Sequence, residues 1–447
     1  MVAELPLVCR PLVCLAWLHP AIVTREARHG PVGNPHPTRH YCSPMPRSVA
    51  VVLTGAAARG AFQAGALAEI VPELERRDLA PTIFLGASAG AINAALWGSF
   101  AHLGSDRAGR RLVDVWRSMG RKDILGHPLG SIVRAGSRLI PGSLVSRGPG
   151  LRALLDTEPL VRTSRTVFDG GRLARNIDDG VLDAVGVVAT RMPTRNAPIG
   201  TARSVVFLDT TLPSAPVADP ARAVDVAPGR VTADKVLASA AIPVAFPAMR
   251  LDDPPSIGGW YVDGGIRLNA PLRPVVSLGA DVVVVVAADA TDYAPAEPPA
   301  PTNEPWPDIA DATALMVHTV LGDRMIEDLH ALRQRNQWIS QGLDPCSDNG
   351  RAYRPIHAVS VAPSPGELGF VAEVVMERKR TSKWRSWVQE SDLLALERVL
   401  RGLGEGTGKR ELLSYVLFDD EYFDCQIDIG RAAAAAAVSQ LDAIPSA

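Results

Sequence analysis

Ser88 is the residue whose surroundings in the sequence most clearly favour chemistry. It lies in Gly86-Ala87-Ser88-Ala89-Gly90, the one match to the pattern G-x-S-x-G in the chain. Glycines two residues on either side leave room for a sharp turn from a strand into a helix, and such a turn exposes the serine hydroxyl as a nucleophile. The positive end of the following helix would favour a developing oxyanion. The alternative is an ordinary serine in a tight turn.

A second candidate is the run Gly55-Ala56-Ala57-Ala58-Arg59-Gly60, which follows an apolar, strand-like segment. Backbone N–H groups in such a turn, at the start of a helix, can bind an anion or an oxyanion. A plain tight turn is the alternative. Because alanine resists positive φ angles by roughly 1 kcal/mol or more, we expect any unusual backbone angle at Gly55 or Gly60 and ordinary angles at the alanines.

A dinucleotide-binding turn is a rival for the same segment, since Val51–Ala57 is similar to the strand and turn of a short-chain dehydrogenase. The spacing G-x-G-x-x-G is absent, however, and no tyrosine is followed four residues later by lysine. Both features are needed for that chemistry, so the sequence argues against a dehydrogenase.

The third candidate is Asp263, which is followed by Gly264 and Gly265 and preceded by the short apolar run Trp260–Val262. Aspartate before glycine is common in turns, so an ordinary turn is the alternative. A carboxylate at the end of a strand nevertheless lies where α/β sheets place their ligands. A serine nucleophile needs a proton acceptor, and an aspartate near its usual pKa of about 3.9 is a weak one. We therefore expect partial desolvation to raise its basicity.

The elements that must position these residues follow a repeated pattern. The apolar runs Val49–Leu53 and Thr82–Leu85 predict buried strands, and each is followed by a turn and a helical pattern, at Ala61–Arg77 and Ala91–Phe100. A strand–turn–helix unit that occurs twice predicts an α/β fold with a parallel sheet and helices on its faces. Further strand-like runs are Val185–Thr190, Ser204–Leu208 and Val282–Ala288.

In this order, GAAARG at 55–60, GASAG at 86–90 and DGG at 263–265 resemble the motifs of patatin-like phospholipases. Ala238–Pro243 and Gly264–Pro271 are similar to that family as well, and the resemblance spans roughly residues 48–290. It implies a three-layer α/β/α patatin-like fold with a mostly parallel central sheet. It also implies a Ser–Asp dyad, with Ser88 as nucleophile and Asp263 as proton acceptor.

The resemblance further implies an oxyanion hole, which would comprise Gly55, Ala56, Ala57, Arg59 and Gly60. Arg59 would add positive charge or orient the loop. Gly86, Gly90, Gly264 and Gly265 would support the motifs sterically. The family's loop usually begins with several glycines, whereas here Gly55 is followed by three alanines.

The expected organisation has four parts. Residues 1–46 contain many prolines and no periodic pattern, which predicts a disordered extension or a start codon assigned too early. Residues 47–290 form the expected catalytic domain, and 291–309 a proline-rich linker or loop. Residues 310–447 form a helical C-terminal region, packed on the catalytic domain or following it.

Composition narrows the possible partners. The formal net charge is -2 without a polybasic stretch, which argues against nucleic acid. No apolar run approaches the roughly 20 residues that span a bilayer, so any membrane contact is expected to be peripheral. Five scattered cysteines without a CxxC pair indicate neither a disulfide framework nor a zinc site, and they favour a cytoplasmic location. We expect no metal or other cofactor, and a lipid or acyl ester as substrate.

Two rival functions remain open at this stage. An α/β-hydrolase with a Ser-Asp-His triad would need a histidine after the acid, and His318, His330 and His357 are available. A lipid- or acyl-binding protein without catalysis is the other rival. The sequence does not define the head group, the acyl length or the positional preference of the substrate.

Overall fold

The computed structural model describes residues 47–119, 166–213, 218–295, 306–343, 353–381, 402 and 404–444. Within these residues nine strands form one sheet, with the order β5-β4-β3-β2-β1-β8-β9 along its main path and with β6 and β7 attached beside β3. The strands are β1 (Val49–Leu53), β2 (Ile83–Ala87), β3 (Ala184–Arg191), β4 (Arg203–Thr210), β5 (Val224–Pro228), β6 (Met249–Leu251), β7 (Gly259–Asp263), β8 (Val282–Val286) and β9 (His357–Val361).

Most neighbouring strands of the sheet run parallel, as predicted. The parallel pairs are β1–β2, β1–β8, β2–β3, β4–β5 and β8–β9, while β4 and β7 each run antiparallel to β3. The central strands β1, β2 and β8 are buried along their whole length. Their continuous apolar sequences follow from this position, because helices cover both faces of a parallel sheet.

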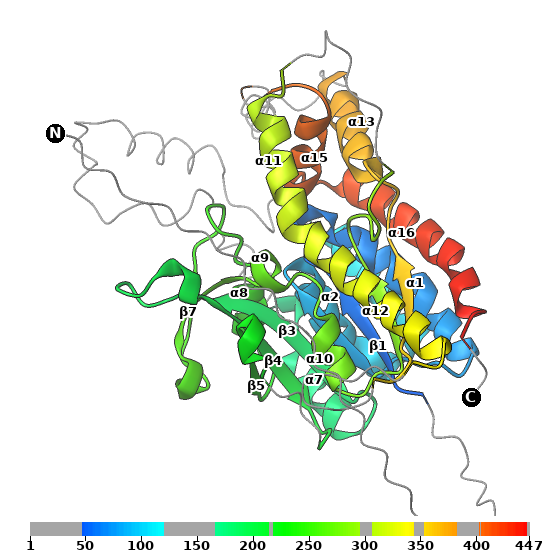
Figure 1. Cartoon of the computed structure of the whole chain (residues 1–447). Helices are drawn as coiled ribbons and strands as arrows, with labels where there is room; N and C mark the ends of the chain where they lie inside the picture. The colour runs from blue at the N-terminus through cyan, green and yellow to red at the C-terminus, as the bar shows by residue number, and fades with distance from the viewer. Residues whose placement is uncertain are drawn as a thin grey trace, which may run out of the picture. The chain divides into compact units, whose positions relative to one another are not determined.

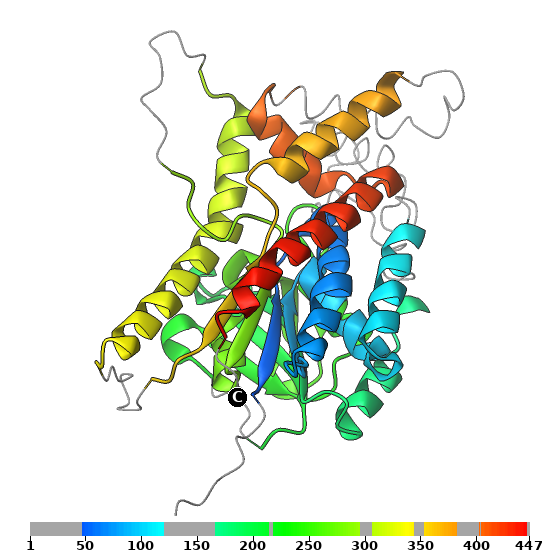
Figure 2. The same cartoon turned by 90° about the vertical axis from the view of Figure 1, so that its right-hand side faces the viewer.

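Helices cover both faces of the sheet (Figures 1 and 2). On one face Val51 and Leu53 pack with side chains of α1, α2, α3 and α16, and on the other Ala50 and Val52 pack with α10 and α12. Three layers, α/β/α, result, which confirms the expected fold class. The helix bounds are α1 (Gly60–Arg76), α2 (Ala89–Phe100), α3 (Ser105–Ser118), α7 (Gly170–Asp178), α8 (Ala233–Ser239), α9 (Gly265–Leu268), α10 (Leu272–Ser277), α11 (Ile309–His318), α12 (Arg324–Ser340), α13 (Glu367–Thr381), α15 (Thr407–Val416) and α16 (Asp420–Leu441).

The C-terminal segments belong to the same sheet and the same helix layers as the segments before them in the chain. Strand β9 extends the sheet beside β8. Helix α16 lies along α1, as Figure 2 shows in red and blue. A Cβ at Gly65 would lie 2.1 Å from the carbonyl oxygen of Ile427, and one at Gly430 would lie 2.1 Å from that of Phe62. Glycines on both helices therefore permit direct backbone contact.

Some of the sequence-based expectations concern residues that lie outside the described ranges. Residues 1–46 and most of the proline-rich segment, 296–305, lie outside the described residues. Cys9, Cys14, Cys42 and Cys346 also lie outside the described residues, and Cys425 is free. No helix in the described ranges is both long enough and apolar enough to cross a membrane.

Candidate active site

Ser88 occupies the sharp turn between β2 and α2, as its motif predicts. Its backbone angles are φ 54° and ψ -127°, a region that residues with side chains rarely adopt. A Cβ at Gly86 would lie 2.2 Å from the carbonyl oxygen of Gly90, and one at Gly90 would lie 2.4 Å from that of Leu53. Both glycines are therefore required sterically, because the turn folds back on itself and against the end of β1.

Asp263 lies at the end of β7, a strand that runs antiparallel to β2 and ends beside it. Strand β4 occupies one edge of β3 along its whole length, and β2 occupies the other edge as far as the pair Ala87–Val188. Strand β7 continues that second edge in the antiparallel sense, and its last residue, Asp263, pairs with Ala189. The ends of β2 and β7 therefore meet at adjacent positions on β3. Asp263 does lie at the end of a strand, but that strand is an antiparallel one.

Ser239, at the end of α8, joins these two strand ends. Its Oγ accepts a hydrogen bond from the Ser88 N–H at 3.0 Å and donates one to the Val188 carbonyl. Its own carbonyl accepts from the Gly264 N–H at 3.2 Å. Ser239 is fully buried, so these bonds are shielded from water. It lies in a stretch that resembles the family, but nothing in its residue type or spacing indicates this contact.

The Asp263 carboxylate is buried, with 4% of the residue exposed. Its Oδ1 accepts a hydrogen bond from the Gly265 N–H at 2.7 Å, whereas Oδ2 is buried without a hydrogen-bond partner among the described residues. Burial raises the pKa of Asp263 from 3.8 to about 7, against the opposing effects of the nearby Ser88 hydroxyl and the Gly265 N–H. A carboxylate with this pKa is a much better base than an exposed one.

The loop before α1 takes a different backbone course from the one predicted. Ala57, at the start of a short 3-10 turn (Ala57–Arg59), has φ 48° in the left-handed region, whereas Gly60 has φ -64°. Gly55 is not among the residues with positive φ. The expectation that a glycine would take the unusual angle is therefore wrong. The neighbours explain the outcome, because Cβ atoms at Gly55 and Gly60 would clash with Asn269 and Trp116, so both glycines serve close packing.

Replacing Ala57 by glycine is expected to raise the free energy of unfolding by about 0.5 kcal/mol, because relief of the steric cost of positive φ, roughly 1–2 kcal/mol, exceeds the roughly 0.5–1 kcal/mol lost through glycine's freedom in the unfolded state. Ala56→Gly is the matched control. Ala56 has φ -142°, so glycine there adds only unfolded-state freedom and should cost about 0.5–1 kcal/mol. Urea denaturation of both variants measures the difference. Equal shifts in the two variants would contradict a strained Ala57.

Gly55 and Asn269 fix the position of this loop relative to Ser88. The Gly55 N–H donates to Asn269 Oδ1 at 2.7 Å, and a Cβ at Gly55 would lie 3.1 Å from the Cβ of Ser88. Asn269 Nδ2 donates in turn to the Leu321 carbonyl at 2.7 Å, in a π-helical turn (Thr319–Asp323) between α11 and α12. The N–H of Gly55 is thus already bonded. Ala56 and Ala57 remain as the candidate oxyanion donors of the loop.

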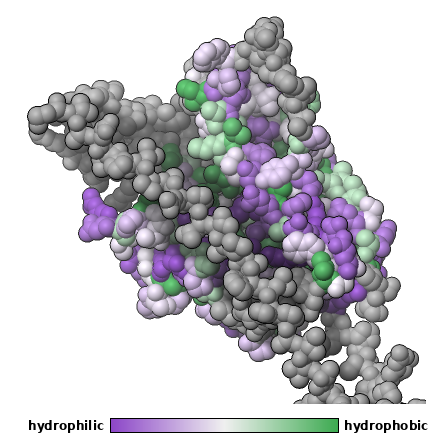
Figure 3. Space-filling model, viewed as in Figure 1, coloured by the Kyte–Doolittle hydropathy of each residue, from purple (hydrophilic) through white to green (hydrophobic). Residues whose placement is uncertain are grey.

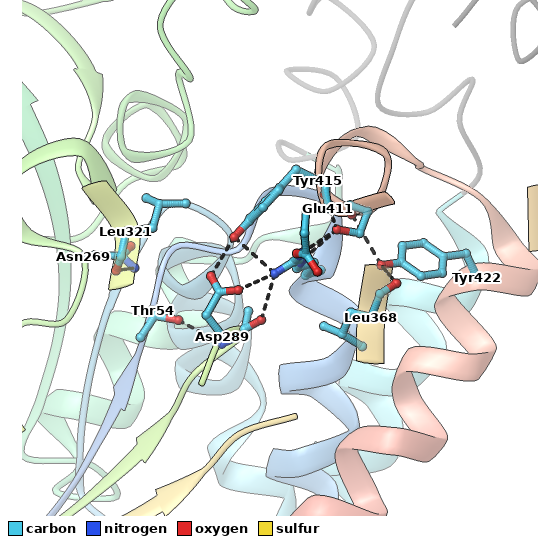
Figure 4. A network of polar contacts seen from close by, with 11 residues as sticks. Thr54, Asn269, Asp289, Leu321, Leu368, Glu411, Tyr415 and Tyr422 are labelled. Atoms are coloured by element: carbon cyan, nitrogen blue, oxygen red, sulfur yellow. Dashed lines mark hydrogen bonds and ion pairs between the residues drawn. The ribbon is translucent and has the colours of Figure 1, made fainter. Parts of the chain in front are cut away.

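Arg59 belongs to a buried polar network with the C-terminal helix α15. Its guanidinium forms ion pairs with Asp289 and Glu411 and lies 3.8 Å from the ring centre of Tyr415. Its Nε donates to Ser414 Oγ at 2.8 Å. Figure 4 shows Asp289, Tyr415 and Glu411 grouped around these contacts. Two carboxylates offset its charge, so the geometry favours Arg59 as the residue that orients the loop.

An apolar pocket of about 40 Å³ adjoins Ser88. Side chains from widely separated parts of the sequence line it, including Ile92, Trp116, Phe246 and Phe418. Ala57 and Ala89, which belong to the loop and to the start of α2, complete the wall nearest Ser88. The nucleophile candidate therefore faces a space that suits hydrocarbon rather than a polar group.

The three histidines proposed for a triad do not meet the candidate dyad. His357 is the first residue of β9, so it lies at the N-terminal ends of the parallel strands, whereas the turn that follows β2 lies at their C-terminal ends. His318 and His330 are exposed on α11 and α12. No histidine among the described residues is hydrogen-bonded to Ser88 or Asp263. In the same part of the chain, no cluster of histidine, cysteine, aspartate or glutamate could hold a metal ion.

An α/β sheet that carries a serine on a strained strand-to-helix turn is typical of serine hydrolases. The family model described as patatin-like phospholipase matches residues 51–276, half of the chain, so the protein belongs to that family. Membership implies a lipid acyl hydrolase. Residues 404–444, which hold Arg59 and complete the pocket, lie outside the matched range.

Two solved structures are similar at low identity. VipD from Legionella pneumophila is 13% identical, with 85% of this chain and 67% of that chain covered and a TM-score of 0.24. Human GIVD cytosolic phospholipase A2 is 11% identical, with 87% of this chain covered and a TM-score of 0.33. The match covers 60% of the human protein, less than two thirds of its length. No curated protein matches the chain.

Proposed function

We propose that the protein hydrolyses the acyl esters of phospholipids or lysophospholipids through a Ser88–Asp263 dyad and an acyl-enzyme intermediate. The observation that carries this proposal is the meeting of β2 and β7 on one edge of β3. It brings a buried carboxylate to a serine on a strained turn. A nucleophile beside a base of raised pKa is the minimal machinery for acyl transfer.

The proposed reaction has two steps. Asp263 accepts the Ser88 proton as Oγ attacks the ester carbonyl, and the N–H groups of Ala56 and Ala57 stabilise the tetrahedral oxyanion. The alcohol leaves with the proton from Asp263. Asp263 then takes a proton from water, which attacks the acyl-enzyme and releases the fatty acid and the serine hydroxyl. The positive end of α2, which begins directly after Ser88, stabilises the same negative charge.

Contact with a lipid surface is part of the proposal, because acyl esters of this class reside in aggregates and bilayers. Helix α11 exposes Ile309 and Met316, two turns apart on one face, and Leu315 beside them. Figure 3 shows hydrophobic surface over this helix. Exposed apolar side chains on a helix favour peripheral contact with lipid.

The test is covalent labelling with a fluorophosphonate, which reacts with activated serines. We expect the label on the peptide that contains Ser88, as measured by peptide mass spectrometry, and none on heat-unfolded protein. A lipid panel then defines the head group. Labelling at another serine would contradict the assignment of the nucleophile. Absence of both labelling and hydrolysis would favour the rival function, a lipid-binding protein without catalysis.

A further inference from the structure

The pocket beside Ser88 has a wall that comes from outside the family-matched range. Phe418 lies in the short connection between α15 and α16, more than 100 residues beyond the end of the match. It is 9% exposed, and its ring packs edge-on against Phe423 at 6.5 Å. Phe423 packs edge-on against Trp116 in turn, at 5.3 Å. The C-terminal segment therefore contributes directly to the surroundings of Ser88.

The lining of this pocket indicates which part of the substrate it binds. Apart from Ser88 itself, every lining side chain is apolar. A polar head group there would lose its hydrogen bonds to water without replacement, at a cost that an alkyl chain avoids. The volume of about 40 Å³ corresponds to only about three water-sized groups, so only a short stretch of chain fits between these walls.

The side chain of Phe418, unlike that of Trp116, is held by apolar contacts alone. Trp116 is fixed, because its Nε1 donates to Asn93 Oδ1 at 2.7 Å and its ring packs on Gly60, at the start of α1. Phe418 makes no side-chain hydrogen bond and lies in a connection between helices. A change of its size therefore alters the pocket without breaking a hydrogen bond of α1 or of the loop before it.

We infer that the pocket binds the acyl chain of the substrate and that Phe418 limits the length of chain it accepts. This inference rests on the proposed function and extends it, because it assigns specificity to a residue that the family match does not include. Removal of the ring opens the pocket to longer chains. Each additional methylene that becomes buried strengthens transition-state binding.

The experiment measures kcat/KM for p-nitrophenyl esters from acetate to palmitate. In Phe418→Ala the optimum should move to longer chains, with the ratio of long-chain to short-chain kcat/KM raised about tenfold. Phe418→Trp fills the pocket further and should move the optimum to shorter chains. Phe370→Ala is the matched control, because Phe370 is 58% exposed on α13 and does not line the pocket. Its profile should equal that of the unmodified protein.

The outcomes separate the two proposals. An unmodified protein that hydrolyses no ester contradicts the proposed function, and the inference falls with it. Active Phe418 variants with unchanged profiles contradict the role of Phe418 alone. If Phe418→Ala does not fold, Phe418→Trp and Ala240→Val, which narrows the pocket from the end of α8, still test the pocket. Both should shorten the preferred chain, and an unchanged optimum in both overturns the inference.

Discussion

Replacement of Ser88 by glycine is expected to abolish ester hydrolysis and at the same time to stabilise the fold. Loss of the nucleophile in a serine hydrolase lowers kcat by up to about a millionfold. The backbone of Ser88, at φ 54° and ψ -127°, stores strain that amounts to about 1–3 kcal/mol for a residue with a side chain. Glycine relieves that strain, but its greater freedom in the unfolded state offsets part of the stabilisation. We therefore expect the free energy of unfolding to increase by about 1 kcal/mol.

Ser88→Ala separates the chemistry from the strain. Alanine removes the hydroxyl but keeps the Cβ, so activity should be lost to the same extent while the free energy of unfolding stays near that of the unmodified protein. Hydrolysis of a chromogenic ester and urea denaturation, each performed on both variants, provide the measurements. Hydrolysis within tenfold of the unmodified rate in either variant would show that Ser88 is not the nucleophile.

Local sequence was sufficient to predict the turn at Ser88, because its geometry depends on nearby atoms. Gly86 and Gly90 face each other across the turn, and no other residue type fits there. The strands β1 and β8 were equally predictable, since burial on both faces permits only continuous apolar runs. Helix bounds followed from periodicity to within a few residues, as at α1.

The loop at residues 55–60 could not be predicted in the same way, because distant residues determine it. Asn269 binds the N–H of Gly55 across 214 residues, and Ser414 binds Arg59 across 355. These contacts hold Ala57 at a positive φ that its own preference disfavours. The sequence motif is local, whereas the contacts that set the backbone angle of Ala57 come from α15 and from the segment after β7.

The antiparallel direction of β7 could not be predicted from the sequence, for a related reason. The run Trp260–Val262 indicates a strand but carries no information on direction, and its partner β3 lies about 70 residues earlier in the chain. Direction decides the site, since only an antiparallel β7 brings Asp263 to the end of β2. Sequence motifs identified both members of the candidate dyad, but the pairing of the strands explains why they meet.

Asp263→Asn is expected to lower kcat and to remove a pH-dependent loss of stability. General-base catalysis contributes about 10²–10⁴-fold, and an amide cannot accept the serine proton. In the unmodified protein kcat/KM should rise with pH around an apparent pKa near 7, because Asp263, with a pKa of about 7, acts only when ionised. The dependence around that pKa should disappear from the residual activity of Asp263→Asn.

The sign of the stability effect follows from linkage. The folded protein holds the Asp263 proton up to about pH 7, whereas in the unfolded chain the pKa returns to about 3.8. Between these values the folded state binds more protons, so the free energy of unfolding falls as pH rises from about 4 to 7. The full loss is on the order of 4 kcal/mol, since each pKa unit corresponds to about 1.4 kcal/mol.

Asparagine does not ionise, so at pH 8 Asp263→Asn should be more stable than the unmodified protein, and at pH 4 the difference should vanish. Urea denaturation at both pH values measures the change. A variant that is less stable at pH 8 would show that the carboxylate is held charged in the fold, which would contradict Asp263 as a base of raised pKa.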